Sequence, residues 1–173
     1  MIRKATGADI DAISGIYERI HMHEQRKLMQ IGWLPGVYPV RGTAEAALER
    51  GDLFVYEEKG SILASAIINQ TQVDVYAQGN WAYSAADDKV MVLHTLVVDP
   101  DANKRGIGKS FVEFYEQYAR ECGCTVLRMD TNEKNAVARA FYKKLGYREA
   151  GIVPCEFNGI PNVMLVLLEK GVN

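Results

Sequence analysis

The run VMVLHTLVV (Val90–Val98) constrains the fold of this chain more than any other stretch. Its apolar residues stand at consecutive positions instead of alternating with polar ones, and many of them are β-branched. A strand with this pattern is buried on both faces, because neither face carries the polar residues that water would solvate. The run therefore predicts a strand inside a sheet that other elements cover.

The rest of the chain supplies shorter strand-like runs and helical periodicity. Ile10, Ile13, Tyr17 and Ile20 share one helical face, after Thr6 as a predicted N-cap. Strands are predicted at residues 2–5, 52–58, 61–70, 90–98, 125–130, 147–153 and 163–168, and helices at 6–29, 43–48 (with Thr43 as N-cap), 107–118 and 135–145. This order predicts an α/β domain with a mixed sheet, and the lack of a repeat or linker predicts a single domain over residues 1–173.

Composition excludes several classes of protein. Twenty basic side chains face 22 acidic ones, so a net charge of −2 gives no bulk attraction to nucleic acid or to an anionic membrane. The first residues lack the apolar core of a signal peptide, and no apolar run approaches the roughly 18 residues of a membrane span. Three cysteines, an odd number, suit reduced thiols. We expect a cytoplasmic protein that binds neither nucleic acid nor membrane.

No set of residues has the spacing of a metal site. Cys122 and Cys124 flank a single glycine, which is too close for a usual zinc pair. His21 and His23 stand two residues apart on a predicted helix, so their side chains point in different directions. We therefore expect no metal.

The segment VVDPDANKRGIGKS (97–110) carries the first chemical signal. Gly106 and Gly108 bracket the start of a helix directly after the buried strand, where glycine lets the backbone approach a ligand closely. Free N–H groups in the first helical turn favour a phosphate group, and Lys104, Arg105 and Lys109 add positive charge. The segment is neither a Walker A loop nor a complete G-x-G-x-x-G, so these residues alone leave open an ordinary strand-to-helix turn or a phosphate site of another fold.

Two motifs together resemble the GNAT superfamily of acyl-CoA-dependent N-acetyltransferases. VVDPDANKRGIGKSFVEFYEQYA is similar to the acyl-CoA-binding segment of that family, with Asn103 where the family usually has Gln or Arg. NAVARAFYKKLGY (135–147) resembles the family helix Asn-x-x-Ala-x-x-x-Tyr that ends in Leu-Gly and an aromatic residue. The resemblance implies one GNAT-like domain with a mixed, mostly antiparallel sheet flanked by helices. It also implies acetyl-CoA as the acyl donor and direct transfer to an amine in a ternary complex.

The same resemblance implies the residues that hold the cofactor. The end of the long strand pairs with the pantetheine arm, the glycine-containing segment binds the pyrophosphate, and the asparagine that begins the second motif contacts the arm. The implied cofactor-binding residues are Leu96, Val97, Val98, Asn103, Lys104, Arg105, Gly106, Ile107, Gly108, Lys109, Ser110 and Asn135.

Three residues are candidates for proton transfer. Tyr142 matches the family tyrosine that protonates the departing thiolate, and a phenol is a reasonable acid for this step. Asp130 ends a predicted strand where some family members place a carboxylate base, whereas His94 interrupts an apolar strand, where a histidine is more often a core residue. We expect Asp130 to outrank His94 as the group that takes the amine proton.

The acceptor is the least constrained partner. Trp33, Tyr38, Trp81 and Tyr83 fall in predicted loops, where they either line a pocket or plug the edge of the core. A walled site favours a small-molecule primary amine over a protein. The alternatives are acetylation of protein N-termini or lysines, and a domain that binds acyl-CoA without turnover. The sequence leaves the acceptor, the acyl chain length and the oligomeric state open, a homodimer included.

Overall fold

The computed structural model of the chain describes residues 1–102 and 106–172. These residues form two compact units. The N-terminal unit comprises Met1–Met29, Trp33–Ile68 and His94–Tyr115, and the C-terminal unit comprises Gln30–Gly32, Asn69–Leu93 and Glu116–Asn173. Strand β4 (Val90–Val98) and helix α3 (Ile107–Glu121) contribute residues to both units.

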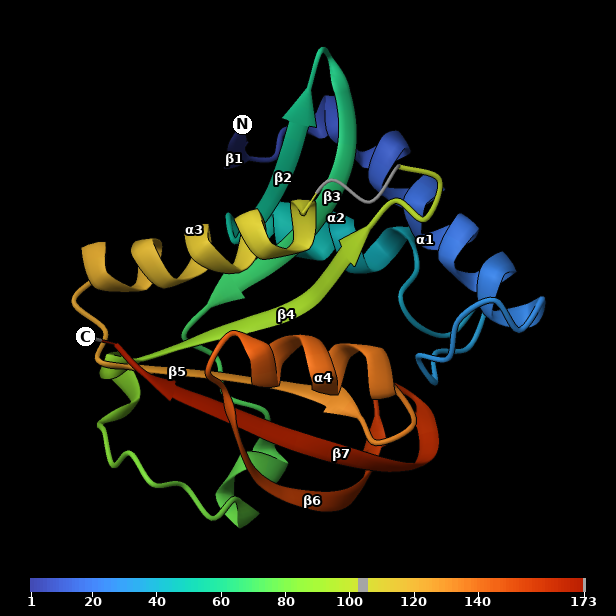
Figure 1. Cartoon of the computed structure of the whole chain (residues 1–173). Coiled ribbons are helices and arrows are strands. Elements are labelled where there is room, and N and C mark those ends of the chain that lie inside the picture. The colour runs from blue at the N-terminus through green and yellow to red at the C-terminus, as the bar shows by residue number, and fades with distance from the viewer. Residues whose placement is uncertain (103–105, 173) are drawn as a thin grey trace. The chain divides into compact units, whose positions relative to one another are not determined.

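The described chain is an α/β fold with a mixed, mostly antiparallel sheet, as the sequence predicts. Seven strands follow the order β1-β2-β3-β4-β5-β7-β6 (Figure 1). The pairs β1–β2, β2–β3, β5–β7 and β6–β7 are antiparallel, and β4–β5 is parallel. The predicted order of strands and helices along the chain is confirmed.

In the N-terminal unit, the sheet strands are β1 (Ile2–Lys4), β2 (Leu53–Glu58) and β3 (Ser61–Asn69), and the helices are α1 (Ile10–Gln25) and α2 (Arg41–Arg50). The predicted apolar face of α1 is buried, and Ile16, which is not part of that prediction, is buried as well. Helix α1 ends at Gln25, four residues before the predicted end. After it, the loop contains a short turn in which Leu34 and Tyr38 form an isolated bridge.

The start of α2 corrects the predicted cap at Thr43. The helix begins two residues earlier, at Arg41, with Val40 as its N-cap. The Thr43 hydroxyl instead accepts a hydrogen bond of 3.1 Å from the backbone N–H of Val40. The side chain thus serves the helix start from inside the first turn, an arrangement related to a capping box.

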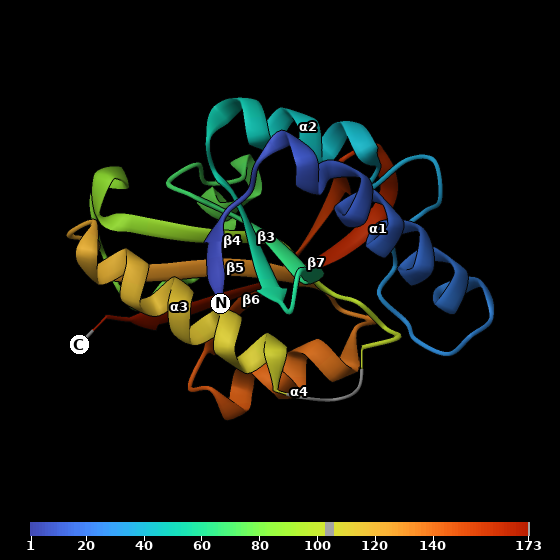
Figure 2. The same cartoon turned by 90° about the horizontal axis from the view of Figure 1, so that it is seen from above.

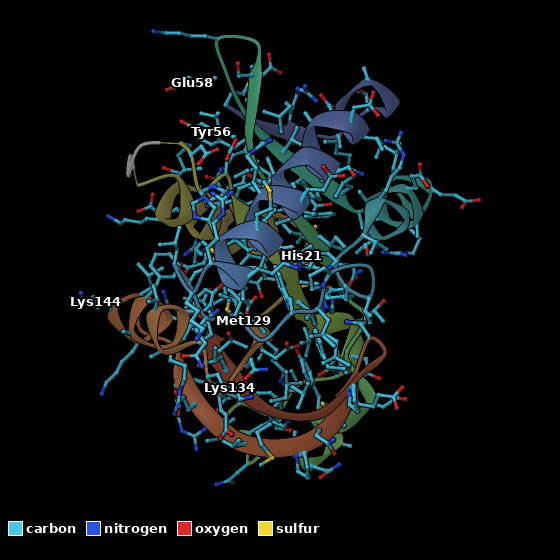
Figure 3. The ribbon with its side chains drawn as sticks, turned by 90° about the vertical axis from the view of Figure 1, so that its right-hand side faces the viewer. His21, Tyr56, Glu58, Met129, Lys134 and Lys144 are labelled. Carbon is cyan, nitrogen blue, oxygen red and sulfur yellow. The ribbon has the colours of Figure 1, made fainter. Side chains whose placement is uncertain are left out.

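The C-terminal unit is built on β5 (Val126–Asn132), β6 (Arg148–Phe157) and β7 (Ile160–Gly171), with α4 (Ala136–Lys144) between β5 and β6. Figure 2 shows α4 on one side of these strands and the segment that follows β3 on the other. Met129 of β5 lies in the interior, whereas Lys144 of α4 points outward (Figure 3). None of the described helices combines the length and apolar character that crossing a bilayer requires.

Candidate active site

In the N-terminal unit, the predicted cofactor strand β4 carries a local distortion at Thr95. Its φ of 50° lies in the left-handed region, which a β-branched residue rarely adopts. Backbone strain of this kind persists only where surrounding contacts hold it, and it clusters at functional sites. The distortion separates His94, half-buried, from Leu96, Val97 and Val98, the residues expected to pair with the pantetheine arm.

Two aromatic residues of the loop after α1 hold Thr95 in place. The hydroxyl groups of Tyr38 and Thr95 form a hydrogen bond. The ring of Trp33 packs edge-on against Tyr38, with 5.8 Å between ring centroids. Tyr38 therefore supports β4.

The predicted phosphate-binding segment enters α3 through Gly106. Its φ of 72° is a conformation that favours glycine, and a Cβ built there would meet no atom within 4 Å. The backbone is consequently open to a ligand at this point. Ile107 is buried and begins a 15-residue helix, whose first N–H groups have no partner within the helix. These features fit the pyrophosphate of acetyl-CoA.

The basic residues of this segment are only partly described. Asn103, Lys104 and Arg105 lie outside the described residues. Lys109 is exposed and forms an ion pair of 3.4 Å with Glu113, one helical turn further on. Ser110 is exposed and its backbone N–H bonds to the Gly106 carbonyl at 3.0 Å.

In the C-terminal unit, Asp130 has the electrostatics of a base. The Tyr76 hydroxyl donates a hydrogen bond of 2.6 Å to Oδ2 of Asp130. Burial raises the pKa of the Asp130 carboxyl to about 6, although the bond from Tyr76 acts in the opposite direction. Among the residues that the structure describes, no other side chain donates a hydrogen bond to the Asp130 carboxylate. Oδ1 is thus available to a substrate.

Tyr142 of α4 lies in the same unit as Asp130. It is 8% exposed, and burial together with the negative charge of Asp130 raises the pKa of its phenol. Within the described parts of the chain, its hydroxyl has no hydrogen-bond partner. Its ring packs against Tyr147 with 5.8 Å between centroids. The side chain is therefore fixed while its hydroxyl remains free to donate.

Asn135 occupies the N-cap of α4. Its Oδ1 accepts a hydrogen bond of 3.1 Å from the backbone N–H of Ala138. This hydrogen bond occupies the carboxamide oxygen. The NH₂ group is the part of the side chain that could contact a cofactor.

Cys155 of β6 is also close enough to Asp130 to be affected by its charge. Burial and that charge raise the pKa of the thiol. The thiol form therefore predominates at neutral pH, and a thiol is a far weaker nucleophile than a thiolate. These surroundings do not activate Cys155 as a nucleophile.

Tyr76 and Thr95 contact candidate site residues, but the sequence does not predict this. Tyr76 belongs to a 3₁₀ turn (η2, Asp74–Gln78) within a long irregular segment, and no local pattern marks it. Thr95 stands inside an apolar run that predicts regular strand throughout. Of the predicted proton-transfer residues, Asp130 and Tyr142 lie together in the C-terminal unit, and His94 belongs to the N-terminal unit.

Comparison with known proteins agrees with this fold and these motifs. The sequence profile of the acetyltransferase (GNAT) family matches residues 18–147. The [ribosomal protein bS18]-alanine N-acetyltransferase of Escherichia coli K12 is 33% identical over 60 residues, which are 35% of this chain and 40% of that enzyme. The chain thus spans about two fifths of the length of this curated relative.

Solved structures extend the similarity of fold over the whole chain. A GNAT-family acetyltransferase from Streptococcus agalactiae superposes with a TM-score of 0.81 at 22% identity, covering 100% of this chain and 95% of that one. A Salmonella typhimurium structure described with its cofactor acetyl-CoA gives a TM-score of 0.67 at 20% identity, covering 100% and 94%. The fold and the two motifs define a GNAT-type acyltransferase domain. The chain belongs to the acetyltransferase (GNAT) family.

Proposed function

We propose that this protein is an N-acetyltransferase that moves the acetyl group of acetyl-CoA directly to a primary amine. The observation that carries the proposal is the pair Asp130 and Tyr142, which lie in the same unit, near enough for the charge of Asp130 to raise the pKa of the Tyr142 phenol. A carboxyl group with a pKa of about 6 is ionised at neutral pH, and a phenol with a raised pKa stays protonated. One group is ready to accept a proton and the other to donate one, which is the pattern of an acid–base pair.

Acetyl-CoA supplies the activated acyl group and a thiolate leaving group. The open backbone at Gly106 and the N-terminus of α3 bind its pyrophosphate, and the end of β4 from Leu96 to Val98 binds its arm. The Asn135 NH₂ group is a further donor toward the arm. Asn103, Lys104 and Arg105 complete the expected set.

Proton transfer follows from the two side chains. Asp130 accepts a proton from the ammonium group through Oδ1, so that the amine nitrogen gains the lone pair that forms the new C–N bond. As the C–S bond breaks, Tyr142 donates its proton to the sulfur, and the nitrogen of the new amide loses its second proton, which restores the Tyr142 phenol. Protonation of Asp130 removes the negative charge that raises the Tyr142 pKa, so the acid becomes stronger at the stage where it is needed.

A small amine is the first acceptor class, since a half-buried base suits a slender amine. The N-terminal α-amine of a protein is the second, and two observations favour it. The E. coli relative is named for acetylating an alanine of a ribosomal protein. Proton transfer from an α-ammonium, with a pKa of about 8, to a carboxylate with a pKa of about 6 is uphill by about 3 kcal/mol, against about 6 kcal/mol from an alkylammonium.

An acceptor panel tests the proposal. Acetyl-CoA is incubated with the protein and spermidine, an aminoglycoside, free alanine, a peptide with an N-terminal alanine, or the same peptide with a blocked N-terminus and an internal lysine. Release of free thiol and acetylation of the acceptor by mass spectrometry are measured. Acetylation of any of these amines supports the proposal, and the preferred one assigns the acceptor class. Tight binding of acetyl-CoA with no acetylation of any amine would favour the non-catalytic acyl-CoA-binding alternative.

A further inference from the structure

The segment of residues 70–83 is fastened to the sheet of the C-terminal unit by a buried carboxylate. Glu169 of β7 is completely buried and accepts hydrogen bonds of 2.6 and 3.3 Å from the backbone N–H groups of Ala82 and Tyr83. Arg148 of β6 forms an ion pair with it. Arg128 and Arg148 stand directly opposite Glu169 on the two neighbouring strands. A buried carboxylate is tolerated only with such partners, so this attachment is specific.

Arg128 forms a second attachment to the same segment. It is 7% exposed, and its Nη1 and Nη2 donate hydrogen bonds of 2.5 Å to Oε1 of Gln72 and 3.1 Å to the Tyr83 carbonyl. Its guanidinium carbon lies 4.1 Å from the centroid of the Trp81 ring, a cation–π distance. Side-chain contacts therefore hold the segment at both of its ends.

Trp81 in turn holds Tyr76. Its indole N–H donates a hydrogen bond of 2.7 Å to the Tyr76 carbonyl, and the two ring centroids are 5.5 Å apart. A Cβ at Gly79 would lie 2.5 Å from the Trp81 ring, so the turn between the two aromatic residues packs tightly. Tyr76 is 2% exposed, and both its backbone and its ring are fixed.

The hydroxyl of Tyr76 is directed at Asp130, the candidate base. Arg128 and Asp130 are two residues apart on β5, so they share one face of the sheet, and the 70–83 segment contacts both. The charge of Asp130 raises the pKa of Tyr142 from α4 and of Cys155 from β6, while the apolar Leu167 pairs with Asp130 from β7. Tyr76 is the group among these that donates a hydrogen bond to the carboxylate.

We propose that Tyr76 is a positioning residue for the reaction: its hydroxyl fixes Oδ2 of Asp130, favours the ionised carboxylate and leaves Oδ1 directed to the amine. Glu169 and Arg128 contribute indirectly, because their hydrogen bonds hold the segment of residues 70–83, which contains Tyr76. This inference rests on the proposed function, since it assigns Tyr76 a role toward the proposed base.

Carbon-13 NMR titration of the aspartate carboxyl groups tests the proposal on the folded protein without any acceptor. Asp130→Asn identifies the Asp130 resonance. In the wild-type protein the midpoint is expected at about 6. Tyr76→Phe keeps the buried ring but removes the donor, so the midpoint should rise by about one pH unit. Tyr83→Phe is the matched control, because Tyr83 contacts the cluster through its backbone; it should leave the midpoint unchanged.

The activity profile gives the second measurement. With an acceptor from the panel, the acidic limb of kcat/KM should move upward in Tyr76→Phe by the same amount as the NMR midpoint. A folded Tyr76→Phe protein whose Asp130 titrates as in the wild type overturns the proposal, whatever its activity. An Asp130→Asn protein that retains full acetylation overturns the assignment of the base instead, so the two failures are told apart.

Discussion

Arg19 of α1 donates hydrogen bonds of 3.0 and 2.8 Å to the two carboxylate oxygens of Asp99, the residue that follows β4. Oδ1 of Asp99 also accepts the backbone N–H of Asp101 at 3.1 Å. The ion pair thus fastens α1 to the start of the segment that leads to Gly106. Bidentate pairs of this kind, when partly buried, are stronger than ordinary surface pairs.

Arg19→Met is expected to lower the free energy of unfolding by about 1–2 kcal/mol, measured by urea denaturation. A double-mutant cycle with Asp99→Asn should show that most of this loss is coupling between the two residues. Arg41→Met is the control, because Arg41 pairs with the exposed Asp11 and its loss should have no measurable effect. A coupling energy near zero for Arg19 and Asp99 would contradict the structural role.

Gly106→Val is expected to abolish binding of acetyl-CoA, measured by calorimetry, while the fold survives. The valine side chain would occupy the open space beside the backbone and is strained at a φ of 72°. Gly36→Val provides a matched control, since Gly36 has a φ of 71° and equally open surroundings in another loop. It should show similar strain and normal affinity. Unchanged affinity in a folded Gly106→Val protein would refute the cofactor assignment.

Tyr142→Phe is expected to lower kcat by roughly 10²–10⁴ with little change in acetyl-CoA affinity, because the ring still packs and the proton donor is lost. The comparison variant is Tyr147→Phe, whose hydroxyl bonds to Glu116 at 3.1 Å and whose ring contacts Tyr142. It should keep kcat near the wild-type value. Full turnover by Tyr142→Phe, with chemistry rate-limiting, would mean that another group protonates the thiolate.

Asp130→Asn is expected to stabilise the protein at pH 8. The folded-state pKa of Asp130 is raised to about 6 from about 4, so the ionised carboxylate destabilises the fold, fully above pH 6 and not at all below pH 4. Removing the charge should add about 1–3 kcal/mol of stability at pH 8, and the gain should vanish as the pH falls toward 4. Denaturation at both pH values measures it. A loss of stability at pH 8 would show that the carboxylate is not strained by burial.

Most secondary structure could be predicted because it depends on local patterns. The helical face of α1 and the apolar run of β4 were both identified correctly. The strand predicted at 163–168 was too short, because Glu169 and Lys170 look like a solvated end. In the fold Glu169 is completely buried, since Arg148 and backbone N–H groups from residues 82–83 balance its charge. Only the tertiary structure brings those partners together.

In the candidate site, too, residues in local sequence patterns could be predicted, and residues placed by tertiary contacts could not. Asp130 and Tyr142 could be proposed from motifs of fixed spacing. Tyr76 could not, because its role depends on a hydrogen bond across 54 positions of the chain. Trp81, expected either to line a pocket or to plug an edge, is bound to Arg128 and Tyr76, which favours the second option.

The pH dependence of kcat/KM in Asp130→Asn and His94→Ala tests whether Asp130 is the group that takes the proton from the amine. Because an ordinary histidine titrates near 6.5, the position of the acidic limb cannot distinguish it from a carboxyl group at about 6, and the variants must decide. The assignment of Asp130 as the base predicts that His94→Ala keeps an acidic limb near pH 6, whereas Asp130→Asn loses most of its activity and shows no such limb. Loss of the limb in His94→Ala, with a normal profile in Asp130→Asn, would contradict it.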